Sequence, residues 1–379
     1  MIIWAFLGWT ELEPIANGAF TSNSRRRITM KALVKYESGV GNVDLLEVQE
    51  PTCGVEQVKI EVSYCGVCGT DLHVYHDTFK NYPPVILGHE FSGLVVETGK
   101  NVKNIDCGEK VTVLPASAVM CGECIYCRTG QFMFCSQRRG MGHGVNGALT
   151  RYAVVRHDQV YKIPEGFSLA EAALCEPFAC AVQATSELTN VRLGDVALIS
   201  GPGPIGLMCL KILAAEGVKT IVAGLRDDKL RLDAAKQMGA SLLVNVDEQD
   251  LMSVVAEETN GMGVDVAFEC SGAPASIRSC FEALRRLGSY TQVGISGREI
   301  TLNFDQILYK QLRVVGSVAY SVTTWHRLLK ILNQRAMKLD DLITHALPLE
   351  AWKEAFDLCE RKESIKVLIS PGTFSLAAK

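Results

Sequence analysis

The stretch Val196–Gly206, VALISGPGPIG, decides the fold of the second half of this 379-residue chain. Its first residues, Val196–Ser200, form a short apolar run typical of a buried strand, and Ile205–Glu216 has the pattern of a following helix. Between them, Gly201–Gly206 matches G-x-G-x-x-G, whose glycines allow a tight turn and close backbone approach to a pyrophosphate. The helix N-terminus would present free N–H groups to the phosphates. The cofactor-binding residues predicted from this loop are Gly201, Gly203, Pro204, Ile205 and Gly206.

The rest of the second half alternates strands with helices, which predicts a doubly wound parallel sheet and an α/β fold class. The expected strands are Thr220–Gly224, Leu242–Asn245 and Val264–Cys270. The expected helices are Lys229–Met238 and Ala275–Leu287. A glycine-rich turn without a ligand is the alternative for the loop, but its place between a strand and a helix favours a dinucleotide.

The first half has a different texture. From Met30 to about Lys162, short strands broken by glycine and proline predict a β-rich domain. The expected strands there are Val58–Tyr64, Gly93–Glu97, Lys110–Leu114 and Arg151–Val155. After about Ser317 the alternation of strand and helix ends. The tail, with expected helices at Trp325–Leu332 and Leu349–Cys359, is predicted to return to the first domain.

Composition excludes several classes of protein. Hydrophobic residues make up 48% and charged residues 21%, which is usual for a globular chain and excludes a disordered or fibrous one. The formal net charge of −4 argues against nucleic-acid binding, which normally needs a basic excess. The apolar start, Met1–Trp9, is far shorter than the roughly 20 residues of a membrane span and lacks the basic segment of a secretory signal. Residues 1–29 show no sustained period and are predicted to be a disordered extension.

The chain has 14 cysteines, eight of them between Cys53 and Cys135. Without a secretory signal we expect a reducing, cytoplasmic compartment, where clustered cysteines more often bind metal than form disulfides. A spacing of C-x2-C-x2-C-x7-C can wrap one tetrahedral ion, and zinc suits four sulfurs in a closed, structural site. An iron–sulfur cluster is the competing interpretation, but Ser136 stands where a ferredoxin-like motif has proline. The predicted ligands are Cys121, Cys124, Cys127 and Cys135.

A second set of metal-binding residue types is scattered along the chain. Tyr64–His73 reads YCGVCGTDLH and carries two thiols, a hydroxyl and an imidazole. His89 and Glu90 follow in the sequence GHE, and Glu176 stands in CEP. Each fragment alone is compatible with a buried cysteine, a core histidine or a solvent-facing glutamate.

Taken in order, C-G-T-D-x-H, G-H-E, the four-cysteine loop, E-P and G-x-G-x-x-G resemble the zinc-dependent medium-chain dehydrogenases, in particular their sorbitol (L-iditol) 2-dehydrogenase branch. The resemblance runs from about Met30 to the C-terminus. It implies a GroES-like catalytic domain over 30–184, a Rossmann domain over 185–318 and a return to the catalytic domain over 319–379.

The same resemblance implies a catalytic zinc. Its implied ligands are Cys68, His89, Glu90 and Glu176. Glu90 would be an inner-sphere or exchanging ligand, and Glu176 would reach the metal directly or through water. Zinc with an open position would bind the substrate alcohol and lower its pKa, and hydride would pass to the nicotinamide. Thr70 would accept the proton and His73 would pass it onward, with a packing role as the alternative for His73. We therefore expect two zinc ions per chain together with NAD or NADP.

Further cofactor contacts are expected outside the glycine loop. Counting 20 residues from Gly206 leads to Arg226, where an NAD enzyme would place an acid, and a guanidinium there favours the 2′-phosphate of NADP. A shift of one residue that brings Asp227 to the ribose is the alternative. By resemblance, Arg231 packs beside the adenosine. The positions implied near the nicotinamide are Val293, Gly294, Ile295 and Ser317.

The expected function is hydride transfer between NAD(P) and a secondary alcohol, which the resemblance narrows to a polyol such as sorbitol or L-iditol. Alternatives on the same scaffold are oxidation of L-threonine or of butanediol. A zinc-free quinone or enoyl reductase is disfavoured by the metal ligands. A zinc-stabilised binding protein is disfavoured because it has no need of an open metal position. A homo-oligomer, either a dimer or a tetramer, is also expected.

Overall fold

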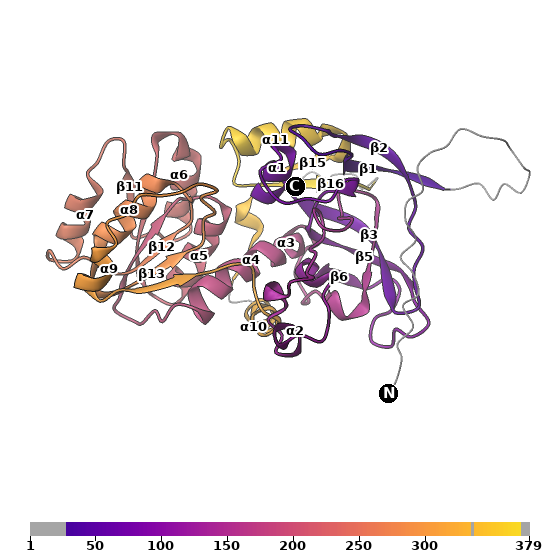
Figure 1. Ribbon diagram of the computed structural model, residues 1–379, viewed down its shortest axis with the longest axis horizontal. Helices are drawn as coiled ribbons and strands as arrows, with labels where there is room; N and C mark the ends of the chain where they lie inside the picture. Colours follow the sequence, from indigo (N-terminus) through magenta and orange to yellow (C-terminus); the bar gives the residue numbers. More distant parts are fainter. Residues whose placement is uncertain (1–27, 335–336, 373–379) are drawn as a thin grey trace, which may run out of the picture.

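The computed structural model describes residues 28–334 and 337–372, and Figure 1 shows two lobes, each built around a sheet. The lobe on the left holds a six-stranded parallel sheet with the order β11-β10-β9-β12-β13-β14. Its strands are β9 (Val196–Ser200), β10 (Lys219–Gly224), β11 (Leu242–Asn245), β12 (Val264–Glu269), β13 (Leu284–Gln292) and β14 (Arg313–Gly316). Its helices are α5 (Pro204–Ala215), α6 (Lys229–Gln237), α7 (Leu251–Glu258), α8 (Pro274–Ala283) and α9 (Asp305–Lys310).

The strand order of this sheet creates a crevice. Chain order reverses between β9 and β12, which are hydrogen-bonded neighbours, and ligands of open parallel sheets bind at such a switch point, beyond the carboxyl ends of the strands. Gly201 follows β9, Cys270 follows β12 and Val293 follows β13, so these residues meet at one edge of the sheet. The glycine-rich loop therefore lies where a dinucleotide is expected.

One predicted element is wrong in part. The expected helix Ala275–Leu287 ends at Ala283, and its last residues form the start of β13. Leu284 has extended backbone angles (φ −66°, ψ 134°) and pairs with Val264 of β12. Ladder pairing with β12 overrides the helical pattern of this polar segment, since propensity is a weak prior against tertiary contacts.

The other lobe is β-rich. It contains a seven-stranded sheet, in which β15-β16-β3-β5-β6-β8 are neighbours and β7 also pairs with β3, and a three-stranded sheet β2-β1-β4. The strands of the larger sheet are β3 (Gln57–Gly66), β5 (Glu90–Thr98), β6 (Lys110–Val113), β7 (Tyr152–Arg156), β8 (Val160–Lys162), β15 (Ile343–Pro348) and β16 (Lys366–Ser370). The smaller sheet consists of β1 (Thr29–Lys35), β2 (Val43–Gln49) and β4 (Val85–Ile86). Together, the β-rich lobe and the parallel sheet confirm the predicted fold class.

Helices of the β-rich lobe and of the junction complete the fold. They are α1 (Gly69–Tyr75), α2 (Ile125–Arg128), α3 (Leu169–Ala173), α4 (Cys175–Val182), α10 (Val322–Asn333) and α11 (Trp352–Glu360). The tail of the chain lies against the first lobe, because β16 pairs antiparallel with β3 through Leu368 opposite Gly66 and Ile369 opposite Cys65 (Figure 1). Thus the last strand of the described chain belongs to the larger sheet of the first lobe.

The two lobes share a buried core. Phe178 on α4, Met208 on α5 and Trp325 on α10 are fully buried and belong to one apolar cluster. Burial of such large side chains contributes roughly 1.5–3 kcal/mol each, so the junction is a packed interface.

The predicted disordered extension covers residues 1–29, of which residues 1–27 lie outside the described residues. Thr29, the last residue of that range, is the first residue of β1.

Candidate active site

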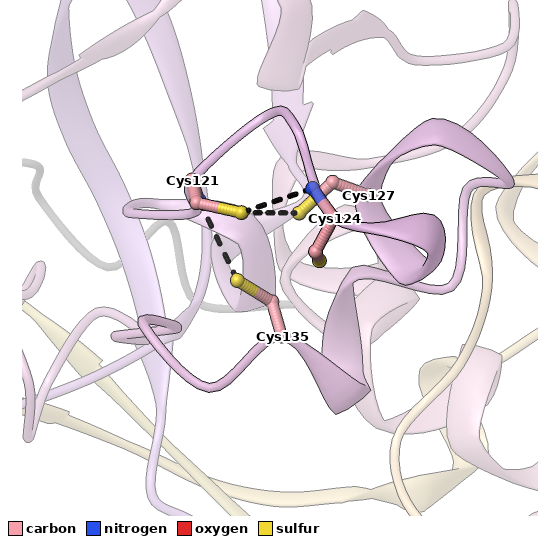
Figure 2. Close-up of side chains that lie close together, drawn as sticks. All are labelled: Cys121, Cys124, Cys127 and Cys135. Atoms are coloured by element: carbon pink, nitrogen blue, oxygen red, sulfur yellow. Dashed lines mark hydrogen bonds between the residues drawn. The ribbon is translucent and has the colours of Figure 1, made fainter.

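Four cysteine side chains converge around α2, as Figure 2 shows. Their sulfur atoms all lie within 4.8 Å of one another, and the sulfurs of Cys121 and Cys127 are 3.9 Å apart. Sulfurs bound tetrahedrally at about 2.3 Å from one zinc ion would be about 3.8 Å apart. The structure brings together Cys121, Cys124, Cys127 and Cys135, which we call the cysteine knuckle, at a spacing that fits one zinc ion.

Backbone groups favour the metal-binding form of one of these thiols, that of Cys121. The N–H of Cys124 donates to the sulfur of Cys121 at 3.3 Å, and hydrogen bonds from the backbone of Cys124 and Glu123 hold the pKa of the Cys121 thiol at about 6. The thiolate is the species that binds metal. Because four sulfurs fill a tetrahedral coordination shell, the cysteine knuckle offers no position to a substrate.

A second ligand group lies where α1 and β5 begin. Cys68 caps α1, His89 directly precedes β5, and Glu90 is its first residue. One ligand atom from each lies within 4.8 Å of the others, and we call these three residues the cavity cluster. Gly88 before them has φ +87°, and a Cβ there would lie 2.6 Å from the sulfur of Cys65, so this turn requires glycine.

Asp71 ties the two segments of the cavity cluster together. Its carboxylate accepts the N–H of Cys68 at 2.9 Å and the N–H of Gly88 at 3.2 Å, and lies 3.8 Å from Nδ1 of His89. Burial alone would lower the pKa of His89, but the thiolate of Cys68 and the carboxylate of Asp71 raise it well above its usual value. The cluster thus attracts positive charge. The sequence contains Asp71 in its GTD segment, but only these contacts reveal its positioning role.

Glu90 is held by a lysine from the far end of the chain. Nζ of Lys366, on β16, lies 2.7 Å and 2.5 Å from the two carboxylate oxygens of Glu90 and also donates to the carbonyl of Val67 at 3.0 Å. Both side chains are buried, and the glutamate raises the pKa of Lys366 although burial alone would lower it. Lys366 could not be predicted from the sequence, because no local motif connects it with GHE.

Glu176 faces the same cavity but lies outside the cavity cluster. Its Oε1 accepts a hydrogen bond from the hydroxyl of Tyr320 at 3.0 Å. Burial raises the pKa of Glu176, and the nearby His89 opposes that shift. Three of the four implied ligands of a catalytic metal are therefore within ligand distance of one another, with the fourth on the wall beside them.

Thr70 and His73 lie one turn apart on α1. Thr70 lines the cavity, whereas His73 is exposed and does not line it. The ring nitrogen Nδ1 of His73 lies 3.0 Å from the hydroxyl of Thr78. A hydroxyl inside and an imidazole at the surface are the two ends that a proton path along this helix would need.

A cavity of about 430 Å³ joins the cavity cluster to the glycine-rich loop. Among the predicted cofactor-binding residues, its walls include Gly203, Pro204, Ile205, Arg231, Val293, Ile295 and Ser317. Gly201, Gly206, Gly294 and Arg226 do not line it. The cavity therefore contacts both lobes, with metal-ligand side chains on one side and a dinucleotide loop on the other.

Two glycines of the loop are required by its backbone conformation and by the close packing of α5 on β9. Gly201 has φ +102°, a left-handed conformation that favours glycine. A Cβ at Gly206 would lie 2.1 Å from the carbonyl oxygen of Gly201, so α5 could not approach β9 as closely with any other residue. Gly203 caps α5 and Pro204 is its first residue, which leaves the first N–H groups of the helix turned toward the cavity edge.

The two arginines near the expected adenosine end differ in their surroundings. Arg226 is exposed at the end of β10, and its Nε lies 3.2 Å from Glu248. Arg231 is largely buried, donates through Nε to the carbonyl of Ser364 at 2.9 Å and lies 3.7 Å from Asp228. Arg231 thus also links α6 to the segment that leads into β16, a contact the sequence did not predict.

The donor set of the cavity cluster fits zinc. Thiolate, imidazole and carboxylate are the usual protein ligands of zinc, and three of them beside an open cavity leave room for a fourth ligand.

No helix within residues 28–334 or 337–372 is long and apolar enough to cross a membrane.

Comparisons with known proteins agree with this geometry. Residues 54–165 match the alcohol dehydrogenase GroES-like domain, and residues 204–334 match a zinc-binding dehydrogenase domain. The chain is similar to a sorbitol dehydrogenase of Halalkalibacterium halodurans, with 38% identity over 90% of this chain and 99% of that enzyme. It is also similar to a D-arabitol-phosphate dehydrogenase of Enterococcus avium, with 36% identity over 90% and 97%. The crystal structure of a putative zinc-binding dehydrogenase from Sinorhizobium meliloti, bound to NADP, superposes with a TM-score of 0.81 at 28% identity, covering 91% of this chain and all of that one.

Proposed function

The chain belongs to the zinc-dependent medium-chain dehydrogenases, and from this premise we propose that it oxidises the secondary alcohol of a polyol at the cavity cluster. It is an oxidoreductase that uses zinc and NAD(P). The observation that carries the proposal is the cavity itself, because Cys68, His89 and Glu90 face the same space as the dinucleotide loop.

Each residue of the cavity cluster has a proposed task. Cys68, His89 and Glu90 hold a zinc ion, with Glu176 beside them as a direct or water-mediated fourth ligand. When bound, the zinc supplies Lewis acidity to the alcohol oxygen, and the nicotinamide supplies the hydride acceptor. Asp71 fixes the orientation of His89, since a carboxylate beside a ligand imidazole sets its geometry and basicity.

The proton of the alcohol leaves along α1. Thr70 accepts it inside the cavity, and His73, one turn on, passes it to solvent. This route agrees with the burial of the two residues, one lining the cavity and one exposed. The cofactor enters from the opposite side and lies against the wall of Ile205, Val293 and Ser317.

Arg226 contributes to cofactor choice in this proposal. An exposed guanidinium at the end of the second strand of the sheet can pair with a 2′-phosphate, and the NADP-bound neighbour supports use of that cofactor. Glu248 competes for the same guanidinium at 3.2 Å. We therefore expect NADP to be used at least as well as NAD.

A polyol is the proposed class of substrate. The two similar enzymes reported above are named for sorbitol and for D-arabitol phosphate, both open-chain polyhydroxy compounds. The test is turnover with both cofactors on a panel of pentitols, hexitols, butane-2,3-diol and L-threonine. Preference for a polyol supports the proposal, and preference for L-threonine or no turnover with any alcohol overturns it.

The proposed oligomer uses the outer edge of the parallel sheet. Strand β14 is the last strand of this sheet, and Val314 on it is half exposed. Phe304, Leu308 and Tyr309, at the start of α9 and on it, are more than two-thirds exposed. An apolar, unpaired sheet edge is normally covered, and a second copy of the chain would cover it. Light scattering on the purified enzyme should give a dimer or a tetramer.

We place the enzyme in a reducing compartment such as the cytoplasm. All 14 cysteines of the sequence lie in the described part of the chain, and none of them forms a disulfide there. A knuckle of four thiolates needs reducing conditions to stay metal-bound. Localisation of the tagged protein by cell fractionation tests this placement.

A further inference from the structure

Arg138 brings a positive charge to the cavity wall. It lines the cavity together with the cavity cluster and Glu176. Its backbone N–H donates to the carbonyl of Cys135 at 3.0 Å, and its Nε donates to the carbonyl of Ala116 at 2.9 Å. The cysteine knuckle therefore fixes the start of the segment that delivers this side chain.

The end of the guanidinium has no partner. Within the described ranges, neither terminal nitrogen of Arg138 forms a hydrogen bond, and no carboxylate lies within ion-pair distance of them. Burial lowers the pKa of Arg138 only from a very high usual value, so the side chain stays charged. Glu176, on the same cavity wall, lies near enough to favour the charged form of Arg138 but forms no direct ion pair with it within the described residues. An anionic group of a ligand can therefore supply a direct partner for the terminal nitrogens.

His143 lies beside the same guanidinium. A Cβ at Gly140 would be 2.8 Å from Nε2 of His143 and 3.3 Å from a terminal nitrogen of Arg138, so both nitrogens border the space that this glycine leaves open. Burial lowers the pKa of His143, so the neutral imidazole is favoured and can donate one hydrogen bond beside the guanidinium.

We propose that Arg138 and His143 form a subsite for an anionic group, a phosphate or a carboxylate, on the part of the substrate remote from the carbon that is oxidised. This inference rests on the proposed function. A guanidinium binds two oxygens of such a group with charge-assisted hydrogen bonds, and the imidazole binds a third. The substrate would then lie between the anion subsite and the cavity cluster.

The geometry favours an anion over a neutral polyol end. Hydroxyl groups donate as well as accept, whereas the terminal nitrogens of Arg138 can only donate. A phosphate or carboxylate offers acceptors alone and also neutralises the charge. Sites built around such unpaired donors discriminate strongly against analogues that lack the matching group.

The test compares a hexitol, its terminal phosphate ester and the corresponding aldonate as substrates. For wild-type enzyme we expect kcat/KM to be at least about 30-fold higher for one anionic substrate than for the hexitol. In R138L we expect that value to fall about 100-fold, mainly through KM, while kcat/KM for the hexitol stays within about threefold. R138K should retain part of the preference, because it keeps the charge but loses the two-pronged geometry. Which anionic substrate responds tells phosphate from carboxylate.

Matched controls separate a binding role from a structural one. R139L alters the neighbouring arginine, which lies over the ring of Tyr82 and outside the cavity, and should leave all three substrates unchanged. A wild type that prefers the hexitol, or an R138L enzyme that loses activity on all three substrates equally, overturns the subsite. If no alcohol is turned over, the proposed function fails. Calorimetric binding of the polyol phosphate and the aldonate to wild type and R138L then still decides the subsite.

Discussion

The cysteine knuckle and the cavity cluster differ in how the chain builds them. The four knuckle ligands come from one loop, Cys121–Cys135, and are enough to fill a tetrahedral coordination shell by themselves. The cavity cluster joins the start of α1 to the start of β5, depends on Asp71 for its geometry and on Lys366 of β16 for its charge balance. A site from one loop can close on a metal, whereas a site assembled from several elements can be left open toward a substrate.

The largest expected effect separates the two sites by activity. Removing the thiolate of Cys68 takes away one of three clustered ligands, and metal-based stabilisation of a developing charge is worth several kcal/mol. We expect C68S to lower kcat at least about 10³-fold while the thermal unfolding midpoint changes little. The matched control is C65A, which alters a buried cysteine outside the cluster and should keep most of its activity. Normal turnover by C68S would remove the cavity cluster from the mechanism.

The next effect tests the charge balance of the cavity cluster. In K366M, Glu90 is left buried without its partner, and breaking such a pair costs about 3–5 kcal/mol. The double variant K366M/E90Q carries no charge at either position and should be more stable than K366M alone. Denaturant unfolding of the three proteins measures both values. Equal stabilities of K366M and wild type would show that the pair does not hold β16 to the sheet.

A smaller loss of stability is expected at the cysteine knuckle. Activity should fall there only as far as the loss of stability unfolds the protein. C121S should lose the structural zinc and about 2–3 kcal/mol of stability, because metal binding contributes folding free energy. A change of that size lowers the unfolding midpoint of a chain of 379 residues by roughly 3–4 °C, because the unfolding entropy is about 2.1 cal/mol/K per residue. Calorimetric scans with kcat measured well below the transition check this. Complete loss of turnover in a C121S protein that unfolds like wild type would reverse the roles of the two sites.

The sequence predicted these two sites to different extents. The knuckle follows from its spacing alone, since ligands within one loop must lie close together in space. The cavity cluster could be named only by resemblance, because nothing local connects Cys68 with His89. Asp71, Lys366 and Arg138 remained hidden, since each acts through contacts between segments far apart in the chain.

The fold shows the same division. The strand Val196–Ser200 and the glycine loop after it were placed correctly, because a short apolar run followed by G-x-G-x-x-G is decided locally. The end of α8 was misplaced, because the residues after Ala283 have a helical pattern but pair with β12. Boundaries that depend on a neighbouring strand cannot be read from one segment.

The smallest expected effect sharpens the cofactor side of the cavity. R226D should shift the ratio of kcat/KM for NADP to that for NAD toward NAD by about 10- to 100-fold, or roughly 1.4–2.7 kcal/mol. E248Q should move the ratio the other way, because it frees the guanidinium of Arg226. Initial rates with both cofactors on the three enzymes decide this. An unchanged ratio in both variants would show that Arg226 does not face the ribose.

Zinc content per chain tests the two-site account most directly. Elemental mass spectrometry on the active wild type, C68S and C121S counts the metal at each site without relying on turnover. We predict two zinc ions in wild type and one in each variant. Of the two variants, only C121S, which keeps zinc in the cavity cluster, should retain activity. A fully active wild type with a single zinc, or a C68S protein that still binds two, would contradict the account.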